Sequence, residues 1–399
     1  MNPFRTLRIT LTKFHLKRKW RKLAKRRQRV VVRVSSPIKF LKDLDQHGIE
    51  ACVLRWPNEV PDVALRGRQN KKAIDETYGD VDVLVSITKL NDLLPIAAQH
   101  THAGGVKCEL YSVMGIKGTQ FMRYPYYPPL RGLRLMAARQ RHSKGFHCLT
   151  GNGYILSLVY HLVYHKSLAS GIPISAESGA QAVSDNKYSR RLRAEAEREG
   201  VRLPAPITLE NLERWLCENE WQMPFDLLLR WPVRDEWIRR LEFQKASQLS
   251  QAENQKYEFV YFLREDIENT PLEALAENLL AQKFEITQTT WIPPELRKEI
   301  GLWLRGGSWG EGKGRKLILP YKCILCVDHQ WTQPAQVNEL YPHVDNERFF
   351  YKHEIRKELC AAAGRKIYGI HGSDNALEAR YMKSIWRKFI DEQKPARVI

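Results

Sequence analysis

His371 is the residue of this chain whose type and neighbours best suit covalent chemistry. It is followed directly by Gly372, Ser373 and Asp374, so an imidazole, a flexible turn and two short oxygen-bearing side chains stand together. An imidazole nitrogen is nucleophilic at neutral pH, and a phosphoryl group carried on it remains reactive. The pattern predicts a phosphoryl-carrying histidine. The alternative is a loop histidine followed by an ordinary turn and a helix cap.

Residues 364–375 resemble the active-site signature of nucleoside diphosphate kinases, in which Gly-Arg-Asn and two apolar residues lead into His-Gly-Ser-Asp. The resemblance implies that a nucleoside triphosphate, with Mg²⁺ bridging its phosphates, gives its γ-phosphate to the histidine, which passes it to an acceptor. It further implies two catalytic residues, His371 and Ser373, and three ligands of the nucleotide phosphates, Arg264, Arg356 and Lys366.

The chain departs from this kinase signature at several positions. Lys366 replaces the asparagine of Gly-Arg-Asn, and Met382 stands where the family has a glutamate that orients the histidine. Acidic residues near Glu339 and Asp345 replace an arginine and a threonine that bind phosphate. A nucleotide-binding or scaffold protein without catalysis therefore stays open as an alternative.

The residue pattern around the histidine predicts alternating strands and helices. Aromatic and β-branched runs predict strands, and apolar residues at helical spacing predict helices. In chain order these are strand 257–263, helix 271–283, strand 284–291, helix 294–303, strand 321–327, helix 351–363, the histidine loop and helix 375–386. This order suits a ferredoxin-like α/β sandwich, which is also the fold that the kinase resemblance implies.

A second constellation of chemical groups lies nearer the start of the chain. Asp80 and Asp82 stand two residues apart in the apolar run 79–85, and Glu109 lies inside a second apolar run, 106–113. Residues i and i+2 of a strand point to one face, so the two aspartates can hold a divalent cation together. A third carboxylate on a neighbouring strand would complete a metal site for nucleotidyl or phosphoryl transfer. The alternative is a solvated Asp-x-Asp at a strand end.

With 51–56 as a preceding strand and 154–166 as a following helix, this region resembles the minimal nucleotidyltransferase fold of the DNA polymerase beta superfamily. The resemblance implies that the three carboxylates bind Mg²⁺ and that the domain transfers nucleotidyl groups. The superfamily has Gly-Ser or Gly-Gly ahead of the first aspartate, and no such pair occurs between Trp56 and Gly79.

The length and charge of the chain set the domain plan. A chain of 399 residues exceeds the size at which single cores stop growing. Thirteen Lys or Arg and no Asp or Glu occur in residues 1–34, which account for most of the net charge of +19. We expect a mixed α/β (α+β) protein with a basic tail (1–36), a nucleotidyltransferase-like domain (37–170), a helical connector (171–254) and a nucleoside-diphosphate-kinase-like domain (255–392).

Composition also bears on compartment and partners. Seven scattered cysteines, no apolar run of membrane-spanning length and no secretory signal indicate a cytoplasmic protein. Cys323 and Cys326 are interpreted as core thiols, and His161 and His165 as structural residues. Expected partners are a nucleoside triphosphate, a nucleic acid or anionic membrane for the tail, and a second copy of the chain. The preferred function is phosphotransfer through His371. Its rival is metal-dependent nucleotidyl transfer, with a C-terminal domain that senses nucleotides.

Overall fold

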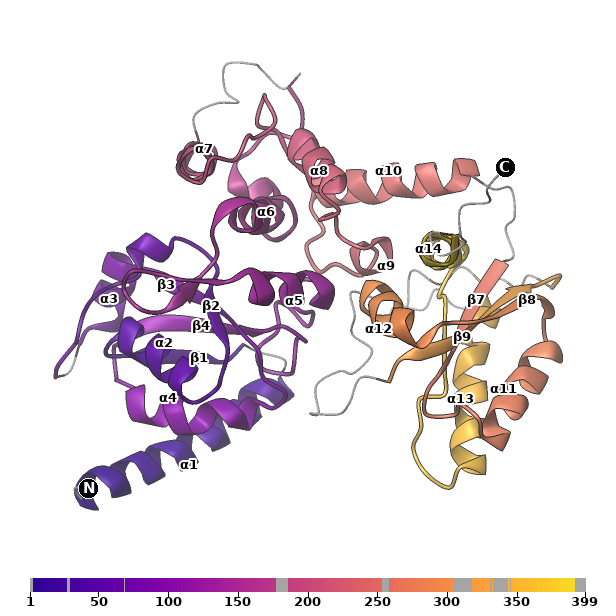
Figure 1. Cartoon of the computed structure of the whole chain (residues 1–399), viewed down its shortest axis with the longest axis horizontal. Helices are drawn as coiled ribbons and strands as arrows, with labels where there is room; N and C mark the ends of the chain where they lie inside the picture. The colour runs from indigo at the N-terminus through magenta and orange to yellow at the C-terminus, as the bar shows by residue number, and fades with distance from the viewer. Residues whose placement is uncertain are drawn as a thin grey trace. The chain divides into compact units, whose positions relative to one another are not determined.

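Two β-sheets organise the chain, one in each of two structural units (Figure 1). The computed structural model describes residues 3–26, 29–67, 69–176, 186–252, 258–304, 318–330, 332, 344 and 346–391. The first unit runs to Met223 and includes Pro232–Ile238. The second unit comprises Pro224–Trp231 and the described residues from Arg239 onward.

The first unit contains a mixed six-stranded sheet of order β1-β4-β3-β2-β6-β5. Its strands are β1 (Val31–Val34), β2 (Ala51–Val53), β3 (Asp80–Val85), β4 (Val106–Ser112), β5 (Gln140–Arg141) and β6 (His147–Cys148). The β3–β4 and β2–β6 pairs are parallel, whereas the other neighbours are antiparallel. The central pair β3–β4 therefore places the two predicted carboxylate-bearing runs side by side.

The two faces of this sheet have opposite character because side chains alternate along a strand. Val81, Val83 and Val85 lie in a buried apolar core, so Asp80 and Asp82 point to the other face. The core is covered by α1 (Pro3–Lys25), α2 (Pro37–Gln46) and α4 (Leu94–His100), while α6 (Gly151–Tyr160) lies across the opposite face (Figure 1). Asp80 and Asp82 therefore lie on the face that α6 covers.

Further helices complete the first unit. They are α3 (Lys71–Tyr78), α5 (Pro129–Ala138), α7 (Lys187–Arg198) and α8 (Leu209–Glu218). The α6 helix continues into a π-helical turn, η3 (His161–Lys166), and both α7 and α8 pack against α6. Part of the segment predicted as a connector, 171–254, therefore belongs to the first unit. Two more helices of that segment are α9 (Phe225–Leu228) and α10 (Glu236–Ala252).

The sequence predicts that residues 1–36 are a tail outside the folded cores, and the structure differs. Leu16 and Trp20 of α1 are 7% and 2% exposed and pack into the core of the first unit. Val32 and Val34 lie on β1, which pairs with β4. Burial of these apolar side chains outweighs the dense positive charge around them, because that charge stays in water on the outer side of the helix.

The second unit contains a four-stranded sheet of order β10-β7-β9-β8 in which every neighbouring pair is antiparallel. Its strands are β7 (Glu258–Arg264), β8 (Glu285–Trp291), β9 (Pro320–Val327) and β10 (Ile370–Gly372). Between them run α11 (Pro271–Ala281), α12 (Pro294–Trp303) and α13 (Tyr351–Ala362), and α14 (Ala376–Asp391) follows β10. These elements confirm the predicted order of strands and helices, with shifts of a few residues at their ends, except at β10, where the sequence predicts a loop and the structure has a strand.

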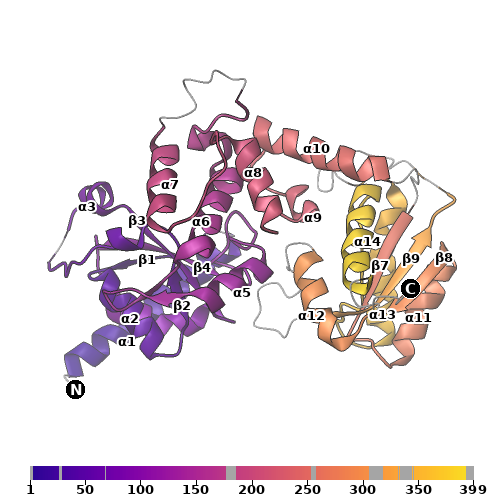
Figure 2. The ribbon, with the colours of Figure 1, turned by 45° about the horizontal axis from the view of Figure 1, so that its top comes forward.

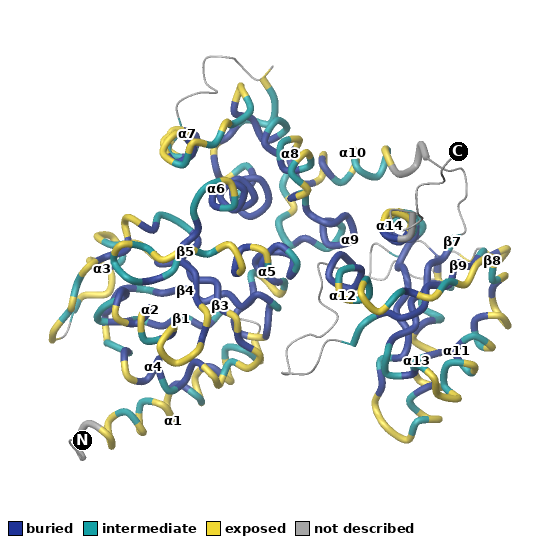
Figure 3. The backbone as a smooth tube through the Cα atoms, viewed as in Figure 1, coloured by how far each residue is buried: buried dark blue, intermediate teal, exposed yellow. Residues whose placement is uncertain are grey.

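Helices cover both faces of the second sheet (Figure 2). Phe259, Tyr261 and Leu263 of β7 pack on one face with apolar residues of α11 and α13. On the other face α14 lies along β7, and α12 contacts both β9 and α14. The strands β7, β9 and β10 are accordingly among the most buried segments of this unit, whereas the edge strand β8 is largely exposed (Figure 3). In the part of the chain that the structure describes, no helix is both long and apolar enough to cross a membrane.

Candidate functional site

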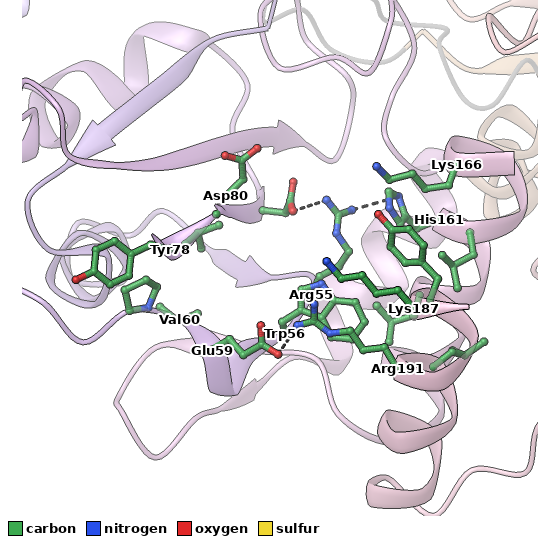
Figure 4. Close-up of a pocket in the computed structure, with 18 residues that line it drawn as sticks. Arg55, Trp56, Glu59, Val60, Tyr78, Asp80, His161, Lys166, Lys187 and Arg191 are labelled. Atoms are coloured by element: carbon green, nitrogen blue, oxygen red, sulfur yellow. Dashed lines mark hydrogen bonds and ion pairs between the residues drawn. The ribbon is translucent and has the colours of Figure 1, made fainter. Parts of the chain in front are cut away.

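A cavity of about 350 Å³ opens on the polar face of the first sheet (Figure 4). One wall comes from the start of β3 and carries Asp80 and Asp82. The facing wall comes from η3 and α7 and carries Lys166 and Lys187. The volume falls in the range of small-ligand sites. Carboxylates and ammonium groups thus face each other across one small space.

The backbone explains why the two aspartates stand at this edge. The α3 helix ends at Gly79, whose φ of 64° reverses the chain into β3. Asp80 is therefore the first residue of the strand, and Asp82 follows on the same face. In the parallel pairing Asp80 lies opposite Lys107 and Asp82 lies opposite Glu109. The structure therefore brings the three predicted metal ligands together on one face.

The oxygens of Glu109 are already bound by neighbouring groups. One oxygen accepts from Arg29 and Lys107, each at 2.6 Å, and the other accepts from the Tyr111 hydroxyl at 2.9 Å. Burial alone would raise the pKa of Glu109, but the Lys107 hydrogen bond and the Arg29 charge lower it below its ordinary value. Glu109 is not among the residues that line the cavity. It is held as an ionised partner of cations.

The two aspartates differ from Glu109. Asp80 accepts a hydrogen bond from Lys107 at 2.7 Å, and its side chain is 39% exposed. Asp82 is buried and pairs with Arg55 through Oδ2, while its Oδ1 has no hydrogen-bond partner among the described residues. Burial raises the pKa of Asp82 despite the Arg55 charge. A bound ligand or ion commonly supplies the missing partner of a buried carboxylate oxygen at a cavity wall.

No three His, Cys, Asp or Glu side chains within the described ranges are grouped so that they could hold a metal ion. Asp80 and Glu109 are instead bridged by the Lys107 ammonium group, which pairs with both carboxylates. An ion held by all three carboxylates stays a prediction. Asp80 and Asp82, which both line the cavity, form a narrower candidate pair.

A hydrogen-bonded chain connects Asp82 to His161. Arg55 pairs with Asp82 and donates to the Tyr126 hydroxyl and to His161 Nδ1, the latter at 3.3 Å. Tyr126 Oη lies 2.6 Å from the same nitrogen. A guanidinium group can only donate, so Nδ1 accepts and the imidazole proton is assigned to Nε2. Burial lowers the pKa of His161 far below its ordinary value. The cavity wall therefore holds a neutral imidazole with an N–H to donate.

The cationic wall carries three basic side chains, Lys166, Lys187 and Arg191. Arg191 lies 3.5 Å above the centre of the Trp56 ring and pairs with Glu59. Lys166 stands 5.8 Å from the Tyr188 ring centre. Among the described residues neither Lys166 nor Lys187 has a carboxylate partner. These two ammonium groups are available to bind an anion.

Sequence reasoning located the acidic wall of the cavity and missed the basic one. Asp80 and Asp82 stand out because they interrupt an apolar strand. The cations Lys166, Lys187 and Arg191 follow no motif and come from helices that are far along the chain. His161 was interpreted as structural, and the structure places it in the cavity wall. Its place on a π-helical turn, a feature that often marks functional sites, has no clear signal in the sequence.

In the second unit, His371 lies on the edge strand β10, opposite Phe262 of β7. Its side chain is buried, with the residue only 4% exposed. The next residue must be small, since a Cβ on Gly372 would lie 2.6 Å from the Tyr261 ring. Ser373, 1% exposed, accepts a hydrogen bond from the Val260 backbone N–H at 3.3 Å. The two predicted catalytic residues are therefore neighbours, but both are covered.

Asp374 of the same motif is held by two cations. Lys352 pairs with Asp374 and donates to the carbonyls of Gly372 at 3.0 Å and Ser373 at 2.9 Å. Arg230 pairs with Asp374 and, at 3.1 Å, with Glu378. These bonds fix the turn between β10 and α14. Neither Lys352 nor Arg230 was singled out from the sequence.

The three predicted phosphate ligands gather around residues 368–370. Arg264 donates to the Ile318 carbonyl at 3.2 Å and lies 5.5 Å from the Tyr368 ring centre. Arg356 donates to the Ile370 carbonyl at 2.9 Å. Lys366 is exposed and lies 5.9 Å from the same tyrosine ring. Both arginines thus bind backbone oxygens in this conformation. Glu339 and Asp345 lie outside the described residues.

Cys323 and Cys326 lie on β9 and are buried. Burial raises the pKa of both thiols, that of Cys326 to about 12. A thiol must lose its proton to bind zinc well, and these two are held in the protonated form. They act as small apolar residues of the strand.

Comparisons of the whole chain with known protein families, curated proteins and solved structures give no match. Any assignment of activity therefore rests on the residues and geometry described above.

Proposed function

We propose that the first unit binds a nucleoside triphosphate in its cavity and transfers a nucleotidyl group, in the manner of a minimal nucleotidyltransferase. One observation carries the proposal: the Asp80–Asp82 pair faces the ammonium groups of Lys166 and Lys187, which have no carboxylate partner among the described residues, across one small cavity. Free cations bind phosphate oxygens, and paired carboxylates suit the metal that accompanies a nucleotide. This ranks nucleotidyl transfer above His371 phosphotransfer, because His371 is covered and the cavity is open.

Several side chains of the cavity, besides the two aspartates, have a role in this proposal. Lys166 and Lys187 bind the β- and γ-phosphates. A hydroxyl of the acceptor bonds to the α-phosphorus, the bond between the α- and β-phosphates breaks, and the β- and γ-phosphates leave as pyrophosphate. His161, neutral with its proton at Nε2, donates a hydrogen bond to a phosphate oxygen. Trp56, with Arg191 stacked on it, forms a flat wall beside the phosphate site. These groups position the α-phosphate at the acidic wall, where charge develops during transfer.

Mg²⁺ is the metal that the nucleotidyltransferase resemblance implies, and Asp80 with Asp82 fits it. The unpartnered Oδ1 of Asp82 is a buried acceptor on the cavity wall. Mg²⁺ is commonly held by one or two carboxylates together with substrate phosphates. When bound, the ion neutralises phosphate charge. Glu109 does not fit as a third ligand, because both of its oxygens are bonded to Arg29, Lys107 and Tyr111.

Two substitutions separate binding from transfer. Asp80→Asn is expected to abolish transfer from an α-labelled nucleoside triphosphate while nucleotide binding remains. Lys187→Gln is expected to weaken nucleotide binding about tenfold or more, because a charge-assisted hydrogen bond to phosphate is lost. Binding is measured by calorimetry with ATP, GTP, CTP and UTP, and transfer by incorporation of label with Mg²⁺ present.

Each of these two substitutions has a matched control. Glu76→Gln on α3 and Arg193→Gln on α7 make the same charge changes outside the cavity, and both should behave as wild type. Equal binding by Lys187→Gln and wild type would exclude the cavity as the nucleotide site. If the wild type binds nucleotide but transfers no α-label, nucleotidyl transfer is excluded and the first unit is a nucleotide sensor.

A second candidate is phosphotransfer through His371, favoured by the topology of the second unit. The strand order β10-β7-β9-β8 with antiparallel neighbours is the 4-1-3-2 order of a ferredoxin-like sandwich, and His371 lies on the last strand beside the first. This strand order supports the ferredoxin-like fold that the nucleoside diphosphate kinase resemblance implies. In this candidate Arg264 and Arg356 exchange their carbonyl partners for phosphate when the strand edge opens.

Labelling with γ-labelled ATP tests the second candidate. If His371 accepts the γ-phosphate, the protein should acquire label that is acid-labile and alkali-stable, because a phosphoramidate has that chemistry. The label should vanish in His371→Ala and persist in His329→Ala, a variant of an exposed histidine on the same unit. Absence of label in the wild type with Mg²⁺ rules out the phosphohistidine.

A further inference from the structure

The α1 helix carries two apolar rows on opposite sides. The inner row includes Leu16 and Trp20, which are buried in the core of the first unit. The outer row consists of Leu7, Leu11 and Phe14, which are 59%, 62% and 71% exposed. Spacings of four and three residues place these three side chains on one line along the helix. In Figure 3 this outer side is exposed along most of the helix.

The same line continues into positive charge. The spacing of four and three residues leads from Phe14 to Arg18, Arg21 and Lys25, all of which are exposed. The helix contains nine Lys or Arg and no Asp or Glu. Its outer side is therefore apolar in the N-terminal half and basic in the C-terminal half. In a helix that is only solvated, a row of exposed Leu and Phe side chains would leave apolar surface in water. Such a row therefore indicates an interaction surface.

We propose that the outer side of α1 is a docking surface for an anionic lipid bilayer. Leu7, Leu11 and Phe14 enter the boundary between headgroups and acyl chains, and Arg18, Arg21 and Lys25 lie at the lipid phosphates. Duplex nucleic acid would satisfy the charges but leave the three apolar side chains in water. A second copy of α1 would satisfy the apolar row but would bring nine like charges against nine.

The docking surface is separate from the cavity. The α1 helix packs on the apolar face of the sheet, and the cavity opens on the polar face that carries Asp80 and Asp82. Bilayer binding can therefore occur with nucleotide bound or absent. The inference does not rest on the proposed nucleotidyl transfer.

Vesicle flotation of the full-length chain tests the surface. Vesicles of phosphatidylcholine with about one-third phosphatidylserine should bind the protein, and vesicles of phosphatidylcholine alone should not. The triple variant Leu7→Ser, Leu11→Ser, Phe14→Ser should lose about tenfold or more in affinity, since apolar burial and charge act together. The triple variant Arg18→Gln, Arg21→Gln, Lys25→Gln should lose affinity as well, and both losses should exceed that of Phe243→Ser.

Phe243 is a fitting control because it is 75% exposed and lies on another helix, α10. Vesicle affinity that is unchanged in the apolar variant overturns the proposal, since charge alone would then explain binding. Equal affinity of wild type for a duplex DNA and for anionic vesicles, with no effect of the apolar variant on either, assigns the surface to nucleic acid instead. A wild-type dimer in sedimentation that the apolar variant dissociates, without vesicle binding, assigns it to a second copy.

Discussion

His161 and His165 are buried, and their burial makes the protein sensitive to mild acid. Burial lowers the pKa of both imidazoles well below the ordinary value of 6.5. In the unfolded chain they take up protons below about pH 6.5, whereas in the folded protein they stay neutral. Their contribution to stability is therefore present above pH 6.5 and is lost as the pH falls toward the folded-state pKa values. Each adds a slope of up to about 1.4 kcal/mol per pH unit.

Chemical denaturation at pH 7.5, 6.5 and 5.5 measures this effect. The free energy of unfolding of the first unit should fall between pH 6.5 and 5.5 and change little above 6.5. In His165→Phe the fall should be smaller, because one of the two protonation sites is removed and the neighbouring rings of Phe121 and Tyr126 can pack on a phenyl group. Parallel curves for wild type and variant would contradict the assignment.

At single residues, sequence analysis succeeded where the backbone alone sets the geometry. Asp80 and Asp82 share a face because residues two apart in a strand always do. That Arg29 neutralises Glu109 could not be foreseen, since Arg29 lies 80 residues from its partner. The positions of Lys166 and Lys187 beside the aspartates could not be predicted either, because both lysines lie far from Asp80 and Asp82 in the sequence. Groups that meet only through tertiary folding leave no local pattern.

At the scale of elements, the short helix α9 has an effect beyond its four residues. Arg230, just after it, binds Asp374 and Glu378, and Glu378 is 0% exposed. Arg230→Met should lower the free energy of unfolding of the second unit by about 3 kcal/mol, because two buried carboxylates lose a cation. Denaturation followed by far-UV circular dichroism provides the measurement.

Arg239→Met is the matched control for this prediction. Arg239 is exposed and belongs to the same unit, so its replacement should change stability little. Equal destabilisation by the two substitutions would show that the Arg230 ion pairs contribute nothing specific to the second unit.

The order of strands and helices in the second unit followed from periodicity, whereas two features of the first unit did not. The helix α12 and the strands β8 and β9 begin and end within a residue or so of their predicted bounds, because apolar spacing and flanking prolines mark them. The tail prediction missed α1 and β1. Charge dominates residues 1–34 by count, but Leu16, Trp20 and Val32 decide where the segment lies. A few buried apolar side chains outweigh many solvated charges.

At the scale of the whole chain, the sequence indicated two α/β parts but not where they divide. The structure assigns Pro224–Trp231 to the second unit and Pro232–Ile238 back to the first. The sheet order β1-β4-β3-β2-β6-β5 of the first unit was likewise beyond single-sequence reasoning. Periodicity identifies a strand, but pairing depends on contacts between distant segments.

The division of the chain bears on its synthesis. Domains generally fold as units, in order, while the chain emerges from the ribosome. Here the first unit lacks part of its chain until Ile238 has been made, and α9 of the second unit is made before that residue. Arg230 can form its ion pair only after Asp374 has been translated, which is 144 residues later. At a translation rate of roughly 5–20 residues per second, this piece of the second unit stays without its ion-pair partners for about 7–30 seconds on every nascent chain.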